Sequence, residues 1–251
     1  MAVTESDIRE SYREQACLAQ AHRWLADVLT DPARVRAAGL PVAVVDVRDA
    51  QPNVARTPDT ITVIFESPRV QRTQAEAPCS ASIGLRFDVG EETLPDIRSI
   101  EVATRGVAGS TRDSGQALRS RVLSLKHRWH TLVEHPAKST EPFREIVTDD
   151  FVMDWGEGRV TSFAELEQWV LGTTSKMSAA RHDLAWFDCK AIGDTTYSAE
   201  FQFDWSGFST RGRRMAARSR HQWRILDDPS RRFACIDRMD VEFLEPFHAV
   251  E

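Results

Sequence analysis

The sequence predicts an α+β protein made of two consecutive units, each with helices packed against a curved antiparallel sheet. Near the C-terminus, residues 197–205, 215–225 and 233–243 alternate apolar and polar side chains and are separated by polar turns. This pattern indicates three long antiparallel strands. Two other stretches, residues 5–30 and 118–132, carry apolar residues at helical spacing, which indicates amphipathic helices ahead of the sheets.

The first half reads as one long helix followed by four strands. Leu18, Ala21, Leu25, Val28 and Leu29 form the apolar stripe of the helix. A short second helix is expected over residues 33–38, and strands are expected over residues 40–47, 60–66, 79–89 and 97–104. This order predicts a reduced helix-plus-four-strand unit over residues 1–108. The Gly-, Ser- and Thr-rich stretch 106–115 predicts the linker that follows it.

The second half, residues 113–251, contains more elements than the first. Its long helix carries an apolar stripe of Leu118, Val122, Leu125, Trp129 and Leu132. A further helix begins at the capping box Ser162-Phe-Ala-Glu165. A short helix, a short strand and a longer strand are also expected, over residues 141–146, 151–155 and 181–191.

Two short matches suggest that the halves repeat each other. His22-Arg23-Trp24 in the first long helix matches His127-Arg128-Trp129 in the second. The late strand Ile97–Val102 likewise matches Ile236–Val241. Because both matches occur in the same order and in equivalent predicted elements, we interpret the first unit as a degenerate copy of the second.

Composition excludes several classes of function. The formal net charge of −6 disfavours a nucleic-acid partner. No apolar run approaches the length of a membrane span, and the polar, acidic N-terminus is unlike a signal peptide, so we expect a cytoplasmic protein without membrane contact. The four cysteines lack metal-ligand spacing, and no glycine-rich phosphate loop is present. We therefore expect neither a metal nor another cofactor.

Several motifs of the second half resemble the SnoaL-like (polyketide-cyclase-like) branch of the nuclear transport factor 2-like superfamily. They are Phe151–Trp155, Ser162–Leu166, Phe203–Trp205, Arg220–Arg224 and Ile236–Val241. The resemblance implies tandem cystatin-like cone folds, complete over residues 113–251 and reduced over residues 1–108. It also implies a pocket between the sheet and the helices. Members of this superfamily include isomerases, dehydratases and cyclases, as well as ligand-binding and interaction modules.

His221 and Asp237 are the first candidates for chemistry, because each interrupts an otherwise apolar strand face. A turn centred near Pro229 would place them directly opposite each other, where side chains come within contact. A carboxylate there could orient the imidazole as a general base. The alternative is a buried pair with a purely structural role. His182 and Asp183 point to opposite faces of their strand, so only one of them can face the pocket.

Asp154 is the third catalytic candidate, and it rests on the resemblance. In isomerases of the superfamily, an aspartate at a similar place abstracts a proton next to a carbonyl; the alternative is an exposed turn residue beside Gly156. Tyr197 could donate a hydrogen bond to a developing oxyanion or could be a core aromatic residue. The residues expected to line a ligand pocket are Tyr197, Trp155, Trp205, Trp223, Phe201 and Met239.

Two functions fit these expectations. The first is cofactor-free acid–base catalysis, such as isomerisation, dehydration or cyclisation, on a small apolar carbonyl or hydroxyl compound. The alternative is a non-catalytic module that binds a small apolar or aromatic ligand or a partner chain. The outer sheet face, which includes Glu200, Asp204, Arg218 and Arg220, is polar and mixed in sign. We expect an intramolecular pseudo-dimer of the two halves, with a homodimer as the alternative.

Overall fold

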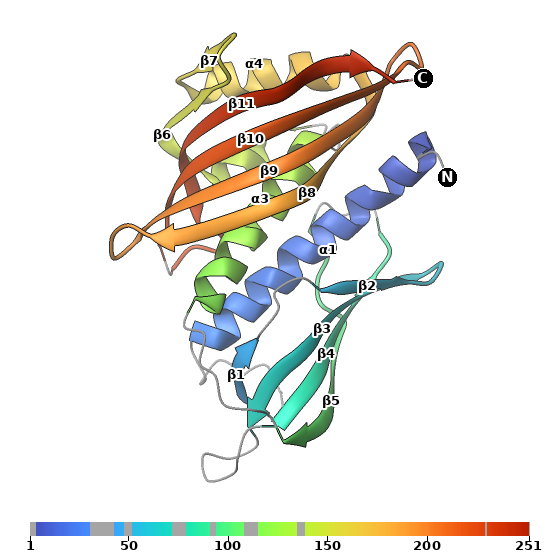
Figure 1. The fold of residues 1–251 in the computed structure, drawn as a ribbon, viewed down its shortest axis with the longest axis vertical. Helices are drawn as coiled ribbons and strands as arrows, with labels where there is room; N and C mark the ends of the chain where they lie inside the picture. The colour runs from blue at the N-terminus through green and yellow to red at the C-terminus, as the bar shows by residue number, and fades with distance from the viewer. Residues whose placement is uncertain are drawn as a thin grey trace. The chain divides into compact units, whose positions relative to one another are not determined.

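The computed structural model describes residues 4–30, 43–47, 52–71, 79–90, 94–107, 115–134, 139–228 and 230–250. The chain divides into two compact units (Figure 1). We call residues 1–15 with 125–251 the C-terminal unit, and residues 16–124 the N-terminal unit. The division runs through both long helices, α1 (Glu5–Thr30) and α3 (Gln116–Glu134). The predicted domain limits, the repeat and the pseudo-dimer stay predictions.

The N-terminal unit packs one side of α1 on an antiparallel sheet. The sheet order is β1 (Ala43–Val47), β3 (Thr60–Gln71), β4 (Cys79–Asp88) and β5 (Ser99–Val107), and β2 (Asn53–Arg56) also pairs with β3. Alternate residues of β4 are buried as the sequence predicts, and Ile83, Leu85 and Phe87 are fully buried. They form a core with Leu25 and Val28 of α1. The helix expected over residues 33–38 lies outside the described residues.

The C-terminal unit is built on a curved six-stranded sheet. Its order is β7 (Arg159–Val160), β6 (Val147–Asp154), β11 (Cys235–Ala249), β10 (Arg214–Leu226), β9 (Thr196–Ser209) and β8 (Met177–Ala191). All these pairings are antiparallel except that of β6 with β11. Bulges in the β8–β9 and β10–β11 pairs accompany the bend of the long strands in Figure 1.

Two helices and a short 3₁₀ turn complete the unit. The turn η1 (Glu141–Glu145) leads into β6, and α4 (Phe163–Thr174) follows β7. The Ser162 hydroxyl accepts a hydrogen bond from Glu165 N–H, which confirms half of the predicted capping box. Glu165 Oε2 completes the helix start on Thr161 N–H instead of on the cap residue itself. The concave sheet face faces α3, so that helix and sheet enclose the unit's interior (Figure 1).

The α+β class predicted from the sequence is confirmed by these helices and antiparallel sheets. On β9 and β10 the predicted faces are also confirmed, since Phe201, Phe203, Trp223 and Ile225 are buried. The opposite face carries ion pairs at the surface, such as Arg218 with Asp204. In the described part of the chain, no helix combines the length and apolarity that crossing a membrane requires. The cytoplasmic location stays a prediction.

Candidate active site

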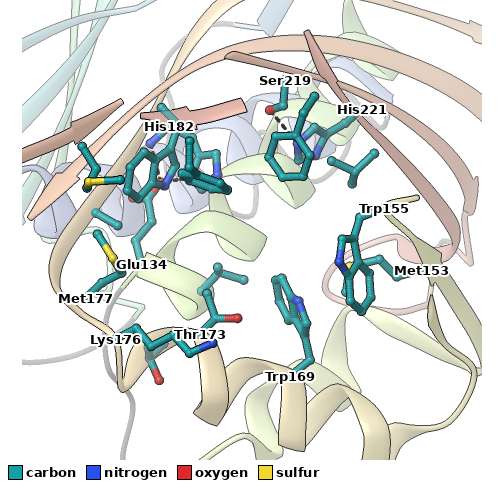
Figure 2. A pocket seen from close by; sticks show the side chains of 18 of the residues that line it. Glu134, Met153, Trp155, Trp169, Thr173, Lys176, Met177, His182, Ser219 and His221 are labelled. Atoms are coloured by element: carbon teal, nitrogen blue, oxygen red, sulfur yellow. Dashed lines mark hydrogen bonds and ion pairs between the residues drawn. The ribbon is translucent and has the colours of Figure 1, made fainter. Parts of the chain in front are cut away.

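The C-terminal unit contains a cavity of about 590 Å³ whose walls are mostly apolar. The large apolar side chains that line it are Trp129, Met153, Trp155, Trp169, Met177, Trp205, Met215, Met239, Phe243 and Phe247. Its buried polar side chains are Glu134, Ser219 and His221, and His182 in the same wall is partly buried. In Figure 2 His182 and Glu134 lie across the open space from Trp155. An apolar cavity with a few placed polar groups suits a small organic molecule.

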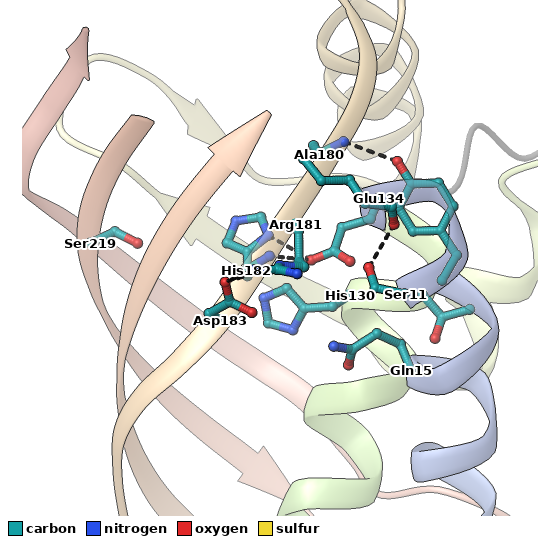
Figure 3. A network of polar contacts seen from close by, with 12 residues as sticks. Ser11, Gln15, His130, Glu134, Ala180, Arg181, His182, Asp183 and Ser219 are labelled. Atoms are coloured by element: carbon teal, nitrogen blue, oxygen red, sulfur yellow. Dashed lines mark hydrogen bonds and ion pairs between the residues drawn. The ribbon is translucent and has the colours of Figure 1, made fainter. Parts of the chain in front are cut away.

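Glu134 and His182 form a hydrogen-bonded pair in the cavity wall. Glu134 reaches from α3 toward His182 on β8 (Figure 3). Its Oε1 atom lies 2.7 Å from the backbone nitrogen of His182 and 2.9 Å from the ring Nδ1. The Glu134 side chain is fully buried, whereas the His182 side chain is 16% exposed. An ionised Glu134 only accepts hydrogen bonds, so it fixes the proton on Nδ1 and leaves a lone pair on His182 Nε2.

Burial controls the charges in this cluster. It lowers the pKa of His182 to about 3, so the imidazole is neutral at neutral pH. Burial also raises the pKa of Glu134 to about 8 and lowers that of the fully buried Lys126 to about 8. The positive charge of Lys126 favours ionisation of Glu134, and the negative charge of Glu134 favours protonation of Lys126. Glu134 therefore gains its negative charge as pH rises through about 8, the same range in which Lys126 loses its positive charge.

His130 lies one helical turn before Glu134 and completes the cluster behind the cavity wall. Its ring is 4.5 Å from the His182 ring, measured between centroids. His130 Nδ1 contacts the Lys126 carbonyl oxygen at 2.8 Å, which places the proton on Nδ1 because a carbonyl only accepts. Burial holds the pKa of His130 well below its usual value. The cluster thus contains two neutral imidazoles around one carboxyl group.

His130, Glu134 and His182 could in principle hold a divalent cation, because their ligand atoms lie within 4.8 Å of one another. Two features favour proton transfer over metal binding. The Oε1 atom of Glu134 already accepts two hydrogen bonds from His182. The buried Lys126 ammonium is also close enough to lower the pKa of both histidines, and it would repel a cation.

Two side chains hold the free edge of β8, which among the described strands pairs only with β9. Ala180 N–H donates to the Tyr12 hydroxyl at 2.9 Å, and His182 N–H donates to Glu134. Tyr12 belongs to the first turns of α1 and packs with Ile8 against Ala179. The first turns of α1 therefore help to position the strand that carries His182.

We expect Tyr12→Phe to lower the free energy of unfolding by about 1–3 kcal/mol, because the part-buried Ala180 N–H loses its acceptor, and that acceptor residue is only 7% exposed. Tyr197→Phe is a matched control, since it removes the chain's other tyrosine hydroxyl, which donates to Asp227 in a part-buried position at 2.9 Å. Denaturant titration measures both variants. A loss for Tyr12→Phe no larger than the loss for Tyr197→Phe would contradict the positioning role.

The predicted pairing of His221 with Asp237 is wrong. His221 lies opposite Val241, four residues beyond the expected partner, because the turn between β10 and β11 is centred later than Pro229. A register shift between Arg224 and Ile225 also leaves Asp237 without a partner in the ladder. Its carboxylate instead pairs with Arg224 and accepts a hydrogen bond from Thr148 at 3.4 Å. His221 alone reaches the cavity.

The structure separates the remaining sequence candidates. Asp154 accepts a hydrogen bond from Gly156 N–H at 3.0 Å and is not among the cavity-lining residues, which fits the turn alternative. Tyr197 is likewise outside the lining and donates to Asp227. Of the expected ligand residues, Trp155, Trp205 and Met239 line the cavity. Trp223 and Phe201 are buried in the core beside it, with ring centroids 4.7 Å apart.

The sequence interpretation missed Glu134, Lys126 and His130. These residues recur every four positions on α3, so they form one polar stripe on a helix that is otherwise read from its apolar residues. That spacing was the available signal. It does not distinguish a site from a solvated face, because only the fold shows that the stripe is buried against β8.

No protein-family model matches the sequence, and no curated protein matches it. Similar solved structures include a nuclear transport factor 2-like superfamily protein from Salmonella enterica, with 13% identity, a TM-score of 0.44, and coverage of 53% of this chain and 94% of that chain. Hexachlorocyclohexane dehydrochlorinase LinA-type3 from Novosphingobium barchaimii has 9% identity, a TM-score of 0.46, and coverage of 53% and 90%.

A protein with a cystatin-like fold from Caulobacter vibrioides has 13% identity, a TM-score of 0.42, and coverage of 51% and 90%. The matched proteins are described as nuclear-transport-factor-like and as having a cystatin-like fold. The matches cover about half of this chain. At these identities the similarity concerns the fold alone.

Proposed function

We propose that the C-terminal unit binds a small apolar carbonyl compound and catalyses proton transfer on it without a cofactor, with His182 as the general base. The observation that carries this proposal is the hydrogen bond between His182 Nδ1 and the buried Glu134 beside the cavity. A carboxylate on one ring nitrogen makes the other a better base and stabilises the imidazolium that forms.

The chemistry is redox-neutral and needs only the residues of the chain. His182 Nε2 takes a proton from the carbon next to the carbonyl, and the electron pair of that C–H bond moves to the carbonyl oxygen. The resulting enolate regains a proton at the same carbon or at a conjugated one, which gives exchange or isomerisation. If the next carbon carries a hydroxyl group, the enolate electrons instead form a carbon–carbon double bond as the C–O bond breaks, and the hydroxyl leaves as water with the proton that His182 had taken. Glu134 stabilises imidazolium throughout.

The test is deuterium exchange next to the carbonyl of small ketones. 1-Tetralone, acetophenone and cyclohexenone are incubated with the full chain in D₂O at pH 9, and label uptake is followed by NMR. We expect exchange of at least one ketone well above the buffer rate, with EDTA causing no loss. Exchange at the buffer rate for all three would contradict catalysis. Loss of activity on EDTA treatment would point to a metal on the His130 cluster instead.

The non-catalytic alternative rests on the same cavity and is separated by binding. Trp129, Trp155, Trp169 and Trp205 line the cavity, so bound aromatic ligands should quench tryptophan fluorescence. Saturable quenching by 1-tetralone without deuterium exchange would favour a ligand-binding module. If no probe quenches the fluorescence and no probe exchanges deuterium, both proposed functions of the cavity are contradicted.

A further inference from the structure

His221 is a buried histidine that the proton-transfer pair does not use. It extends from β10 into the cavity wall and is 6% exposed. Its Nε2 atom lies 3.0 Å from the Ser219 hydroxyl oxygen. Its Nδ1 atom is buried and has no hydrogen-bond partner among the described residues. A buried ring nitrogen without a partner, on a side chain that lines a cavity, is a candidate for a ligand contact, because such groups are rarely left unsatisfied.

The surroundings of His221 are apolar on the sides that face away from Ser219. The edge-on ring of Phe203 is 4.9 Å away, and Val241 is its neighbour on β11. The nearest ionisable ring is that of His182, at 6.3 Å between centroids. No carboxylate among the described residues contacts the ring. His221 is therefore neutral, in agreement with the burial that lowers its pKa to about 3.

A neutral imidazole carries one N–H, and Ser219 decides where it lies. With the proton on Nε2, both the Ser219 hydroxyl hydrogen and the Nδ1 lone pair would lack partners among the described residues. With the proton on Nδ1, the hydroxyl donates to Nε2 and only the Nδ1 N–H remains to be satisfied. The second arrangement leaves fewer groups unsatisfied.

We propose that His221 Nδ1–H is a binding site for the carbonyl oxygen of the ligand, and that Ser219 fixes the tautomer that makes it a donor. This inference deepens the proposed function by naming the substrate class as ketones and related carbonyl compounds. His221 then acts as the electrophile rather than as the base. A neutral donor in a dry wall stabilises the oxyanion of an enolate without first having to lose water.

The two histidines then have complementary roles on one ligand. The lone pair of His182 Nε2 accepts the proton from carbon, while His221 Nδ1–H receives the oxygen on which the electron pair accumulates. Both side chains line the same cavity with their ring centroids 6.3 Å apart, so one small ligand lying beside them can contact both. An ether or a hydrocarbon of the same shape lacks the strong acceptor that this arrangement requires.

The test compares two probes of nearly equal shape, 1-tetralone and tetralin, which differ in the carbonyl oxygen. Dissociation constants are measured by calorimetry or tryptophan quenching. We expect 1-tetralone to bind about tenfold more tightly than tetralin, a ratio that corresponds to about 1.4 kcal/mol. His221→Phe should reduce the ratio to about one. His248→Gln is the matched control and should retain the ratio, because His248 is exposed and lies outside the cavity lining.

Ser219→Ala supplies a second, milder variant in case His221→Phe perturbs the fold. This variant leaves the His221 ring in place but removes the hydroxyl that fixes its proton on Nδ1. The ratio of the 1-tetralone and tetralin affinities should therefore fall toward one, while the affinity for tetralin stays unchanged. An equal ratio in wild-type protein and His221→Phe would overturn the proposal. So would tighter binding of 1-tetralol than of 1-tetralone, because an alcohol suits the opposite tautomer. Since only binding is measured, a carbonyl preference without deuterium exchange would leave this site standing and refute catalysis.

Discussion

Glu134→Gln is expected to slow deuterium exchange by at least about 100-fold while leaving the fold intact. Glutamine has the same shape, and its carbonyl oxygen can still accept from the backbone and ring N–H groups of His182. It lacks the negative charge that stabilises imidazolium as the proton leaves carbon. Removing a general base or its orienting partner typically costs a factor of about 10²–10⁴ in rate.

His182→Gln should show a loss of at least the same size, since it removes the base itself. His248→Gln is the control, because His248 is exposed and lies outside the cavity lining. Circular dichroism and thermal unfolding check that each variant is folded. Full activity in folded Glu134→Gln or His182→Gln would refute the assignment of the base.

The exchange rate should also depend on pH through Glu134. Burial raises the pKa of this group to about 8, so its carboxylate fraction grows as pH rises from 6 to 9. Wild-type exchange, corrected for the buffer reaction, should rise over this range with a midpoint near pH 8. The residual activity of Glu134→Gln should lack that rise.

Acid should destabilise the C-terminal unit steeply. Burial lowers the pKa of His182 and His221 from 6.5 to about 3, and it also lowers that of His130. Because these pKa values are lower in the folded protein, unfolding takes up protons between about pH 6.5 and 3. The stability they contribute is present above pH 6.5 and is lost as pH falls through this window.

The size of the effect follows from the number of protons. Each histidine adds up to about 1.4 kcal/mol per pH unit to the slope of the unfolding free energy. Glu134 offsets the contribution of one of the three histidines. It holds a proton in the folded state at pH values where the unfolded state has lost it. Lys126 is protonated in both states below about pH 8 and contributes little here. The net slope between about pH 4.5 and 6 is therefore up to about 2.7 kcal/mol per pH unit.

Denaturant titrations at a series of pH values measure this slope. His221→Phe should reduce the slope by up to about 1.4 kcal/mol per pH unit, the contribution of one proton, because Phe cannot take up a proton on unfolding. His248→Gln removes an exposed histidine and should leave the slope unchanged. A flat profile between pH 4.5 and 6 in the wild-type protein would contradict the neutral, buried state of these rings.

The sequence predicts the local features of the fold well, because they depend on neighbouring residues. Alternation on β9 and β10 correctly assigns Phe201 and Trp223 to the interior, and the capping residue Ser162 marks the start of α4. Strand ends are less well predicted. The strand expected from residue 181 begins at Met177, since backbone pairing with β9 continues past the alternating segment.

The site was predicted only in part, because it depends on register and on contacts between distant elements. His221 could be found from its apolar face, but its partner could not, since one bulge and a later turn move Asp237 out of line. Glu134 and His182 are 48 residues apart and meet only when α3 packs beside the edge strand β8. Neither residue stands out within its own segment of the sequence.

In the proposed site, Glu134 holds His182 with a proton on Nδ1 and a free lone pair on Nε2. The ¹⁵N chemical shifts of the His182 imidazole at pH 9 report this proton directly. We expect a protonated, pyrrole-type shift for Nδ1 and an unprotonated, pyridine-type shift for Nε2. We also expect the Nε2 shift to change when 1-tetralone is added, and Glu134→Leu to remove the tautomer preference. A proton on Nε2, or an Nε2 shift that does not respond to the ketone, would refute this arrangement.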